Sequence, residues 1–210
     1  MVDVNYSNIA RAYRWLEYLV FASTLQRARL SHLTAFCQNL TEIDCPSIAV
    51  VGDGDGRFLL ELLKAMLDCQ VDYIDCSPGM LVVAKERVGD DSRVSWSCEK
   101  FEEMEGKVYD AIVCHFVLDG FDCEHRNDFV EVIAASLNSN GIVLVSDFDS
   151  TAHCGAAALV VAMQWFFHAC AGVPFVRVTK PDDMLLAQNM TLIAENEWWR
   201  RAVFSQIWKM

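Results

Sequence analysis

Residues 50–63 read VVGDGDGRFLLELL, with glycines at Gly52, Gly54 and Gly56 and an apolar run of helical spacing directly after them. Alternate glycines suit neither a strand interior nor a helix interior, because glycine loses more backbone entropy on folding than any other residue. They do suit a tight turn whose backbone a ligand approaches closely, where the following helix points its N-terminus at that ligand. Since the preceding SIAVVG has the composition of a buried strand, the stretch predicts a strand, a ligand-binding turn and a helix.

The chain beyond this stretch alternates between strand and helix patterns. Strands are predicted at VDYID, RVSWS, YDAIVCHF and GIVLVSDF, and helices at SPGMLVVAKERV, around HRNDFVEVIAASL and at PDDMLLAQ. In SPGMLVVAKERV, Ser77 is the expected N-cap and Pro78 lies in the first turn. Alternation of this kind predicts an α/β fold with a doubly wound, mainly parallel sheet.

The two ends of the chain add to this core. Helices are expected at residues 6–20 and near residues 23–38. At the other end, MTLIAENEWW and RAVFSQIWKM predict two strands joined tightly around Arg200 and Arg201, so one antiparallel strand is expected at or near the sheet edge. We interpret residues 1–210 as a single domain: N-terminal helices at 1–44, the ligand-binding core at 45–148, a helical segment at 149–189 and a C-terminal hairpin at 190–210.

Composition narrows the classes of partner and the location. A chain of 210 residues with 53% hydrophobic residues can form one substantial core. Its formal net charge of -12 disfavours a nucleic acid partner, because acidic surfaces repel phosphate backbones. The nine cysteines include no CxxC pair, and MVDVNYSNIARAY lacks the features of a signal peptide. We therefore expect reduced thiols, packed as small hydrophobic side chains in a cytoplasmic protein.

An uncharged stretch separates Asp149 from Arg177 and is long enough to raise the question of a membrane span. Gln164 and His168 interrupt it, and both would be costly inside a bilayer. We expect a helix over residues 154–171 that helps to cover a binding cleft, with no stable membrane insertion. Its aromatic residues 165–167 are equally compatible with simple core packing.

Three nucleotide-related designs can be compared with the glycine run. A dinucleotide-binding turn has the pattern GxGxxG, and the position of its last glycine is occupied here by Arg57. A phosphate-binding P-loop requires GK followed by Ser or Thr, which is absent from this turn. What remains is GxGxG with an acid, Asp75, at the end of the second strand. A carboxylate at that position can accept hydrogen bonds from both hydroxyls of a ribose.

These segments together resemble the class I S-adenosylmethionine-dependent methyltransferases. VVGDGDG is similar to that family's glycine-rich first motif, and YIDCSPGML to its acid-ended second strand with the following helix. YDAIVCHFVLDGF resembles the segment after the fourth strand, and SNGIVLVSDF the fifth strand. The resemblance covers residues 45–148 well and implies a Rossmann-like seven-stranded sheet. The two ends of the chain are more loosely similar to small-molecule members, including the quinone-biosynthesis type.

The resemblance also implies a set of cofactor-binding residues. The three glycines would line the methionine and ribose parts of S-adenosyl-L-methionine, Asp75 would bind the ribose hydroxyls, and Met80 and Glu99 would contact adenine. The complete set is Gly52, Asp53, Gly54, Gly56, Asp75, Cys76, Met80, Glu99, Phe101 and Cys114. Many members carry an acid where this chain has Val50, so contact with the methionine ammonium would need Asp53 or Asp55. As an alternative, these two acids are solvated groups near a helix start.

Candidate catalytic residues follow the fourth strand. His115 and Asp119 lie where that strand would meet the cleft, and we predict them to be an acceptor-side base and its partner; a structural histidine is the alternative. A metal site built from His115, Asp119, Asp122, Cys123 and His125 matches no zinc spacing, so no metal is predicted.

The predicted function is methyl transfer from S-adenosyl-L-methionine to a small, apolar or aromatic acceptor, with a homodimer left open. A non-catalytic cofactor-binding or protein-interaction module on the same fold is the first alternative. A nicotinamide oxidoreductase is the second, and Arg57 argues against it.

Overall fold

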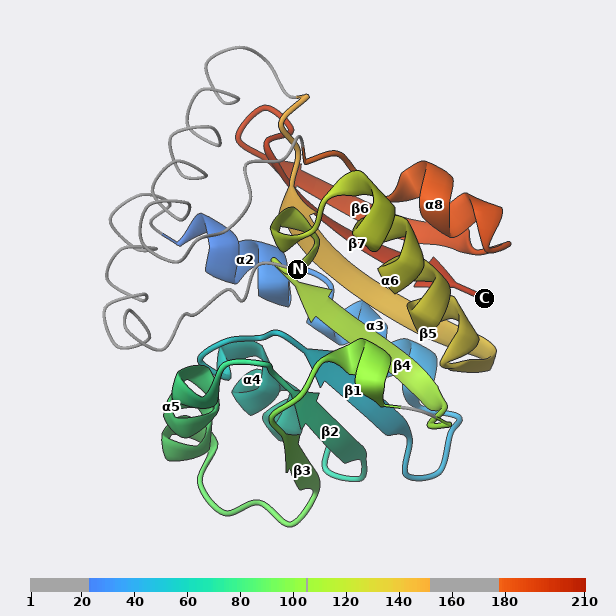
Figure 1. The fold of residues 1–210 in the computed structure, drawn as a ribbon. Helices are drawn as coiled ribbons and strands as arrows, with labels where there is room; N and C mark the ends of the chain where they lie inside the picture. Colours follow the sequence, from blue (N-terminus) through green and yellow to red (C-terminus); the bar gives the residue numbers. More distant parts are fainter. Residues whose placement is uncertain (1–22, 105, 152–177) are drawn as a thin grey trace.

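The fold was analysed in a computed structural model that describes residues 23–104, 106–151 and 178–210. Its centre is a seven-stranded sheet with the order β3-β2-β1-β4-β5-β7-β6 (Figure 1). The strand order reverses between β1 and β4: from β1 the chain adds β2 and β3 on one side, and from β4 it adds the later strands on the other side. In open α/β sheets, such a reversal creates a crevice at the carboxyl ends of the strands.

The first five strands run parallel, as predicted. They are β1 (Ser47–Val51), β2 (Gln70–Ile74), β3 (Val94–Ser97), β4 (Tyr109–His115) and β5 (Leu137–Phe148). The C-terminal hairpin consists of β6 (Thr191–Trp198) and β7 (Val203–Lys209), and β7 pairs antiparallel with both β5 and β6. The predicted antiparallel strand is therefore confirmed, and it lies one position inside the edge.

Helices cover both faces of the sheet (Figure 1). One face packs against α3 (Leu33–Leu40), α4 (Arg57–Ala65) and α5 (Pro78–Val88), while α6 (Cys123–Ala135) and α8 (Asp182–Ala187) pack against the other. The 3-10 turns η2 (Phe101–Glu103) and η3 (Leu118–Gly120) close the loops after β3 and β4. This arrangement confirms the doubly wound α/β fold.

Alternation along the strands divides the core into two layers. On β4, Ala111 and Val113 face the α4 side, whereas Ile112 and Cys114 face the α6 side. Both layers are dry, because the side chains that form them have little or no solvent exposure. The sheet is thus rigid where its strands end, and the loops at those ends have a fixed base.

The helical stretch predicted near residues 23–38 is two helices, α2 (Thr24–Leu30) and α3, separated at Ser31 and His32. His32 forms a 3.1 Å hydrogen bond with the carbonyl oxygen of Ser205, and Ser146 Oγ donates to the carbonyl oxygen of Ala28 at 3.4 Å. These contacts hold the α2–α3 junction against β5 and β7. The helices predicted at residues 6–20 and 154–171 lie outside the described residues.

No helix within the described ranges is long and apolar enough to cross a membrane. The uncharged stretch that raised this question lies largely in residues 152–177, outside those ranges.

The cysteines follow the prediction only in part. All seven that the structure describes are free thiols, but only Cys69 and Cys114 are buried as small core side chains. Cys45, Cys76, Cys98 and Cys123 are exposed, because they lie in loops or at a helix start. The expectation of packed thiols was wrong for these four.

Candidate functional site

The glycine-rich turn has the backbone that its sequence predicted. Gly52, Gly54 and Gly56 all have left-handed backbone angles, with φ of 64°, 67° and 73°. A Cβ atom at Gly52 would lie 2.5 Å from Cγ2 of Val117, and one at Gly56 would lie 3.0 Å from the Cβ of Ala84. At Gly52 and Gly56, glycine is therefore required for both backbone conformation and space. At Gly56 it allows α5 to approach the turn closely.

Asp53 holds the turn to the start of α4. Its carboxylate accepts hydrogen bonds from the backbone N–H groups of Phe58 (3.0 Å) and Leu59 (3.1 Å), which satisfies two amides of the first helical turn. Asp53 is only 3% exposed, and burial raises its pKa to about 7, although the Arg29 charge and the Leu59 amide act in the opposite direction. The alternative of a solvated acid is therefore wrong.

Asp55 is also buried and forms ion pairs on two sides. Its Oδ1 lies 2.8 Å from Nε of Arg57 and its Oδ2 lies 2.7 Å from Nη2 of Arg87. The turn receives a further contact from β2, because the Tyr73 hydroxyl donates to the carbonyl oxygen of Gly54 at 2.8 Å. With both carboxylate oxygens engaged by arginines, Asp55 is poorly suited to bind an ammonium group.

Asp75 lies directly after β2, at the same end of the sheet as the turn. It is 8% exposed, and its Oδ1 accepts a hydrogen bond from the backbone N–H of Ser77 at 2.8 Å. Burial raises the pKa of Asp75 to about 6 against the opposing effect of the Ser77 and Gly54 amides. A buried carboxylate with this raised pKa would gain stability from further hydrogen-bond donors, such as sugar hydroxyls.

The other predicted cofactor residues at this end of the sheet differ in how far they are buried. Cys76 is exposed beside it, and Glu99 is half-buried in the loop after β3. Met80 is buried, with its sulfur 3.9 Å from where a Gly54 Cβ would be, so it lies next to the glycine turn. The predicted N-cap is confirmed, because Ser77 Oγ accepts the backbone N–H of Met80 at 3.4 Å.

Arg29 of α2 brings a positive charge to this end of the sheet. It is 3% exposed, and its guanidinium lies 4.9 Å from the centre of the Phe116 ring. Its charge acts to lower the pKa of both Asp53 in the glycine turn and His115 at the end of β4. The site therefore combines a bare turn, a buried ribose-type acid and a buried cation.

Comparison with known proteins agrees with this geometry. A family model described as "Methyltransferase domain" matches residues 50–143, from the end of β1 to β5. Among solved structures, magnesium protoporphyrin IX methyltransferase from Synechocystis superposes with a TM-score of 0.72 at 15% identity, covering 97% of this chain and 94% of that one. The N-methyltransferase NodS from Bradyrhizobium japonicum gives 0.64 at 14% identity, with 88% and 87% covered. The family model thus covers fewer than half of the 210 residues, and the solved structures show that the fold is shared with methyltransferases.

Curated relatives of this chain match over parts of its length. A malonyl-[acyl-carrier protein] O-methyltransferase from Anoxybacillus flavithermus is 29% identical over 109 residues, which is 51% of this chain and 41% of the relative. A second from Ilyobacter polytropus is 32% identical over 81 residues, or 38% and 30%. The matches thus span less than half the length of these relatives. Neither relative is of the quinone-biosynthesis type, which stays a prediction.

The predicted acceptor-side base and its partner do not meet. His115 ends β4 on the α4 side of the sheet, where its ring lies 4.6 Å from that of Phe58 in an edge-on contact. Asp119 lies within η3, near Asp147 and Arg126 on the α6 side. Strand alternation and the positive φ of Phe116 (58°) cause this separation. The pairing of His115 with Asp119 was therefore wrong.

His115 is nonetheless unusual for a core residue. It is 1% exposed, and among the described residues neither ring nitrogen has a hydrogen-bond partner. Burial and the nearby Arg29 charge keep its pKa well below the usual range, so the ring is neutral at physiological pH. The lowered pKa makes the ring a weak proton acceptor, and the nitrogen without a partner among the described residues is what keeps His115 as the candidate base.

A carboxyl pair forms the corresponding cluster on the α6 side. Asp147 accepts hydrogen bonds from the backbone N–H groups of Leu118 (2.8 Å) and Asp119 (3.3 Å), so it fixes the loop after β4. Burial raises the pKa of Asp147 to about 6, and burial and the Asp147 charge raise that of Asp119 well above its usual range. The buried guanidinium of Arg126 offsets part of this effect.

Two predicted cofactor residues are core residues instead. Phe101 is 3% exposed and packs its ring against Phe129 and Tyr109, at 6.0 and 6.3 Å between centroids. Cys114 is 1% exposed within the same apolar layer. Because both side chains point into that layer, the prediction that they contact cofactor is not supported by the geometry.

Two of the residues considered for a metal site, Asp122 and His125, have ordinary structural roles. Asp122 caps α6 through the backbone N–H of His125 (3.0 Å), and its carboxylate also pairs with the His125 ring at 2.8 Å. In the part of the chain that the structure describes, no three acidic, histidine or cysteine side chains form a metal-binding group.

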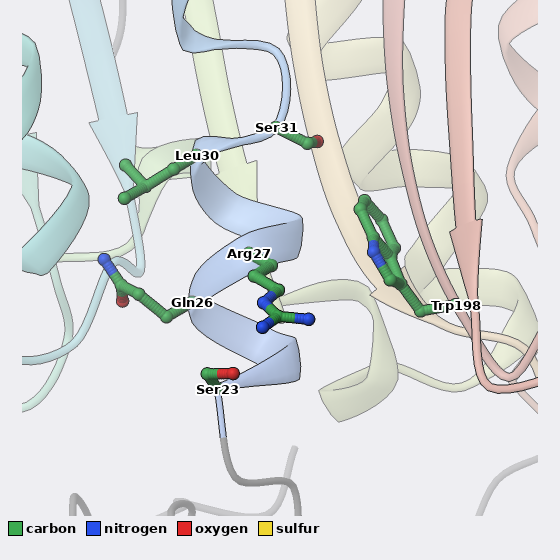
Figure 2. Close-up of a pocket in the computed structure, with 6 residues that line it drawn as sticks. All are labelled: Ser23, Gln26, Arg27, Leu30, Ser31 and Trp198. Atoms are coloured by element: carbon green, nitrogen blue, oxygen red, sulfur yellow. The ribbon is translucent and has the colours of Figure 1, made fainter.

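A shallow groove beside α2 is separate from the cofactor end. Figure 2 shows that residues on or beside α2 line it together with Trp198 from the end of β6: Ser23, Gln26, Arg27, Leu30, Ser31 and Trp198. None of the predicted site residues is among them.

Several residues of the candidate site were not predicted from the sequence. Arg29, Tyr73, Arg87, Arg126 and Asp147 all contact or influence site residues. Each is an isolated polar residue within an ordinary helix or strand pattern. The one available signal was Asp147 in VSDF, an acid at the end of a strand that meets the same crevice.

The raised pKa of Asp75 gives a prediction about stability. The unfolded carboxyl titrates near 3.8 and the folded one near 6, so the protonated acid favours folding and this contribution is lost as pH rises from about 4 to 6. The free energy of unfolding of Asp75→Asn minus that of wild type should therefore increase by about 2–3 kcal/mol between pH 4 and pH 8. Urea unfolding of both ligand-free proteins at the two pH values measures it. A constant difference between them would contradict the prediction.

Proposed function

We propose that this chain is an enzyme that transfers a methyl group from S-adenosyl-L-methionine to a small acceptor. The observation that carries the proposal is the buried Asp75 carboxylate beside a left-handed GxGxG turn. At Gly54 the turn leaves room beside the backbone, because the atom nearest to a Cβ there would be the Met80 sulfur at 3.9 Å. Asp75 supplies acceptor oxygens for two hydroxyls. The residues present therefore fit the cofactor.

The roles of the chain's own residues follow from their chemistry. Asp75 would hold the ribose, the turn would take the adjoining methionine part, and Arg29 would face its carboxylate. The sulfonium of the bound cofactor makes its methyl group electrophilic. The main contribution of the protein is then to hold the acceptor in line with that methyl group and to exclude water. Where the acceptor arrives protonated, we propose His115 as the group that takes the proton.

For the acceptor, we propose a molecule with an apolar or aromatic body. Phe116 follows β4 and Phe148 is the last residue of β5, with ring centroids 5.0 Å apart, and Trp199 packs against the same cluster. Such a cluster at the strand ends suits an apolar ligand better than a charged one. Carboxyl methylation of an acyl chain on a carrier protein is the second candidate, favoured by the names of the curated relatives.

Cofactor choice is the first test. Calorimetric titration should detect binding of S-adenosylmethionine and of its demethylated product, S-adenosylhomocysteine, and no binding of NAD. The reason is that Gly56 is followed by Arg57 where a dinucleotide-binding turn needs its third glycine. Binding of NAD without binding of either sulfur compound would overturn the proposed function.

Turnover separates an enzyme from a non-catalytic binding module. Radiolabelled methyl transfer should be measured with aromatic hydroxy and amino compounds and with malonyl-acyl carrier protein. Transfer to the first group supports a small acceptor, and transfer to the carrier-bound acid supports the second candidate. The binding module keeps its place because Val50 is a core residue with no exposure, where many members have an acid. Tight cofactor binding without turnover on any acceptor would favour it.

A further inference from the structure

Arg87 lies in the last turn of α5 and makes two contacts with one residue of the glycine turn. Its Nε donates to the backbone carbonyl oxygen of Asp55 at 2.6 Å, and its Nη2 donates to Oδ2 of the same residue at 2.7 Å. The Asp55 side chain is 4% exposed and that of Arg87 is 23% exposed, so the ion pair is largely shielded from solvent. A planar guanidinium with two fixed donors therefore restrains both the backbone and the side chain of Asp55.

The glycine turn depends on such restraints. Asp55 lies between Gly54 and Gly56, two residues with little intrinsic conformational preference. Without outside contacts, a bare turn would occupy many backbone conformations, and binding a ligand would require the loss of that freedom. Tyr73 holds Gly54 from β2, and Arg87 holds Asp55 from α5.

The same face of α5 makes the close packing contact. Ala84 lies one turn before Arg87, and its Cα would be 3.1 Å from a Cβ at Gly56. Since Asp75 and Ser77 lie directly before α5, this one helix connects the ribose-type acid to the turn. Arg87 thus fixes the turn relative to the acid that would bind the same ligand.

We propose that Arg87 is a positioning residue for the cofactor, acting through Asp55 to hold the glycine turn in its binding conformation. The inference rests on the proposed function, because it assumes that S-adenosylmethionine occupies this turn. Arg87 makes its contacts with the protein, and its effect on the ligand is indirect.

Arg93 provides a matched control. It is a part-buried arginine of similar design, with Nη1 donating to the carbonyl oxygens of Leu63 (3.1 Å) and Met66 (2.7 Å), and Nη2 paired with Asp91 at 2.6 Å. It ties the end of α4 to the loop before β3, away from the glycine turn. Removing it should affect folding stability without affecting the turn.

The test measures S-adenosylhomocysteine affinity by calorimetry, and amide hydrogen exchange over residues 52–59, for wild type, Arg87→Met, Arg87→Lys and Arg93→Met. Arg87→Met loses two charge-assisted hydrogen bonds, so we expect affinity to fall about tenfold or more and exchange over the turn to accelerate. Arg87→Lys keeps the charge but not the two-point contact, so its affinity and its exchange rates should lie between those of wild type and Arg87→Met. Arg93→Met should bind within about twofold of wild type. If Arg87→Met does not fold, Asp55→Asn tests the same contact from the other side.

The outcomes are distinct. If wild type binds S-adenosylhomocysteine and Arg87→Met binds it equally well, the positioning role is wrong and the proposed function stands. Equal losses in Arg87→Met and Arg93→Met would show a general stability effect and would also overturn the positioning role. If wild type does not bind the compound, the proposed function fails and this inference fails with it.

Discussion

Replacing Asp75 with alanine is expected to weaken S-adenosylhomocysteine binding by about two orders of magnitude or more. The physical reason is the loss of two charge-assisted hydrogen bonds to ribose hydroxyls in a shielded site, each contributing roughly 1.5–3 kcal/mol. Asp75→Asn keeps the size and one acceptor oxygen, so its loss should be smaller. Calorimetric titration of the three proteins at pH 8, where the wild-type carboxyl is ionised, measures the effect.

Folding must be followed alongside binding. Asp75 lies at the end of β2 and not in either apolar layer, so both variants should fold, and thermal melts of the ligand-free proteins check this. Asp72→Asn is a useful control, because Asp72 belongs to the same strand but pairs with Lys107 and Tyr109. It should bind like wild type. Unchanged affinity in a well-folded Asp75→Ala protein would show that the acid assigned to the ribose is the wrong one.

Gly56→Ala is expected to cause a larger loss of stability than Gly54→Ala. The residue has φ of 73°, and its new methyl group would lie 3.0 Å from the Cβ and 3.1 Å from the Cα of Ala84. The second of these atoms belongs to the backbone of α5, so the helix itself must move. Left-handed strain and overpacking together should cost about 2–4 kcal/mol. For a chain of this length, the Tm should fall by about 5–15 °C.

Gly54→Ala separates the two causes. Its φ of 67° imposes similar backbone strain, but the nearest atom to its new Cβ is the Met80 sulfur at 3.9 Å, an ordinary contact. It should therefore lose only about 1 kcal/mol, or about 2–4 °C in Tm. Differential scanning calorimetry of both ligand-free variants makes the comparison. Equal losses would mean that the approach of α5 to Gly56 contributes nothing.

The sequence by itself determined the fold and the positions of the glycine turn and Asp75 within it. Strand composition, helical spacing and caps are local properties, and so is the glycine pattern that requires left-handed backbone at Gly52, Gly54 and Gly56. Asp75 could be placed because it follows a strand directly, and the ends of parallel strands meet at one edge of a sheet. The C-terminal hairpin and the Ser77 cap were predictable because they also depend on local sequence.

Only the tertiary structure decided which side chains meet. His115 and Asp119 are four residues apart, yet strand alternation and the left-handed Phe116 send them to opposite faces of the sheet. Asp55 meets Arg87 across 32 residues, and the Arg29 charge reaches Asp53 from a helix that precedes the first strand. Sequence patterns report periodicity and burial along one element. Contacts between elements depend on how helices pack on the sheet, which no single stretch of this chain encodes.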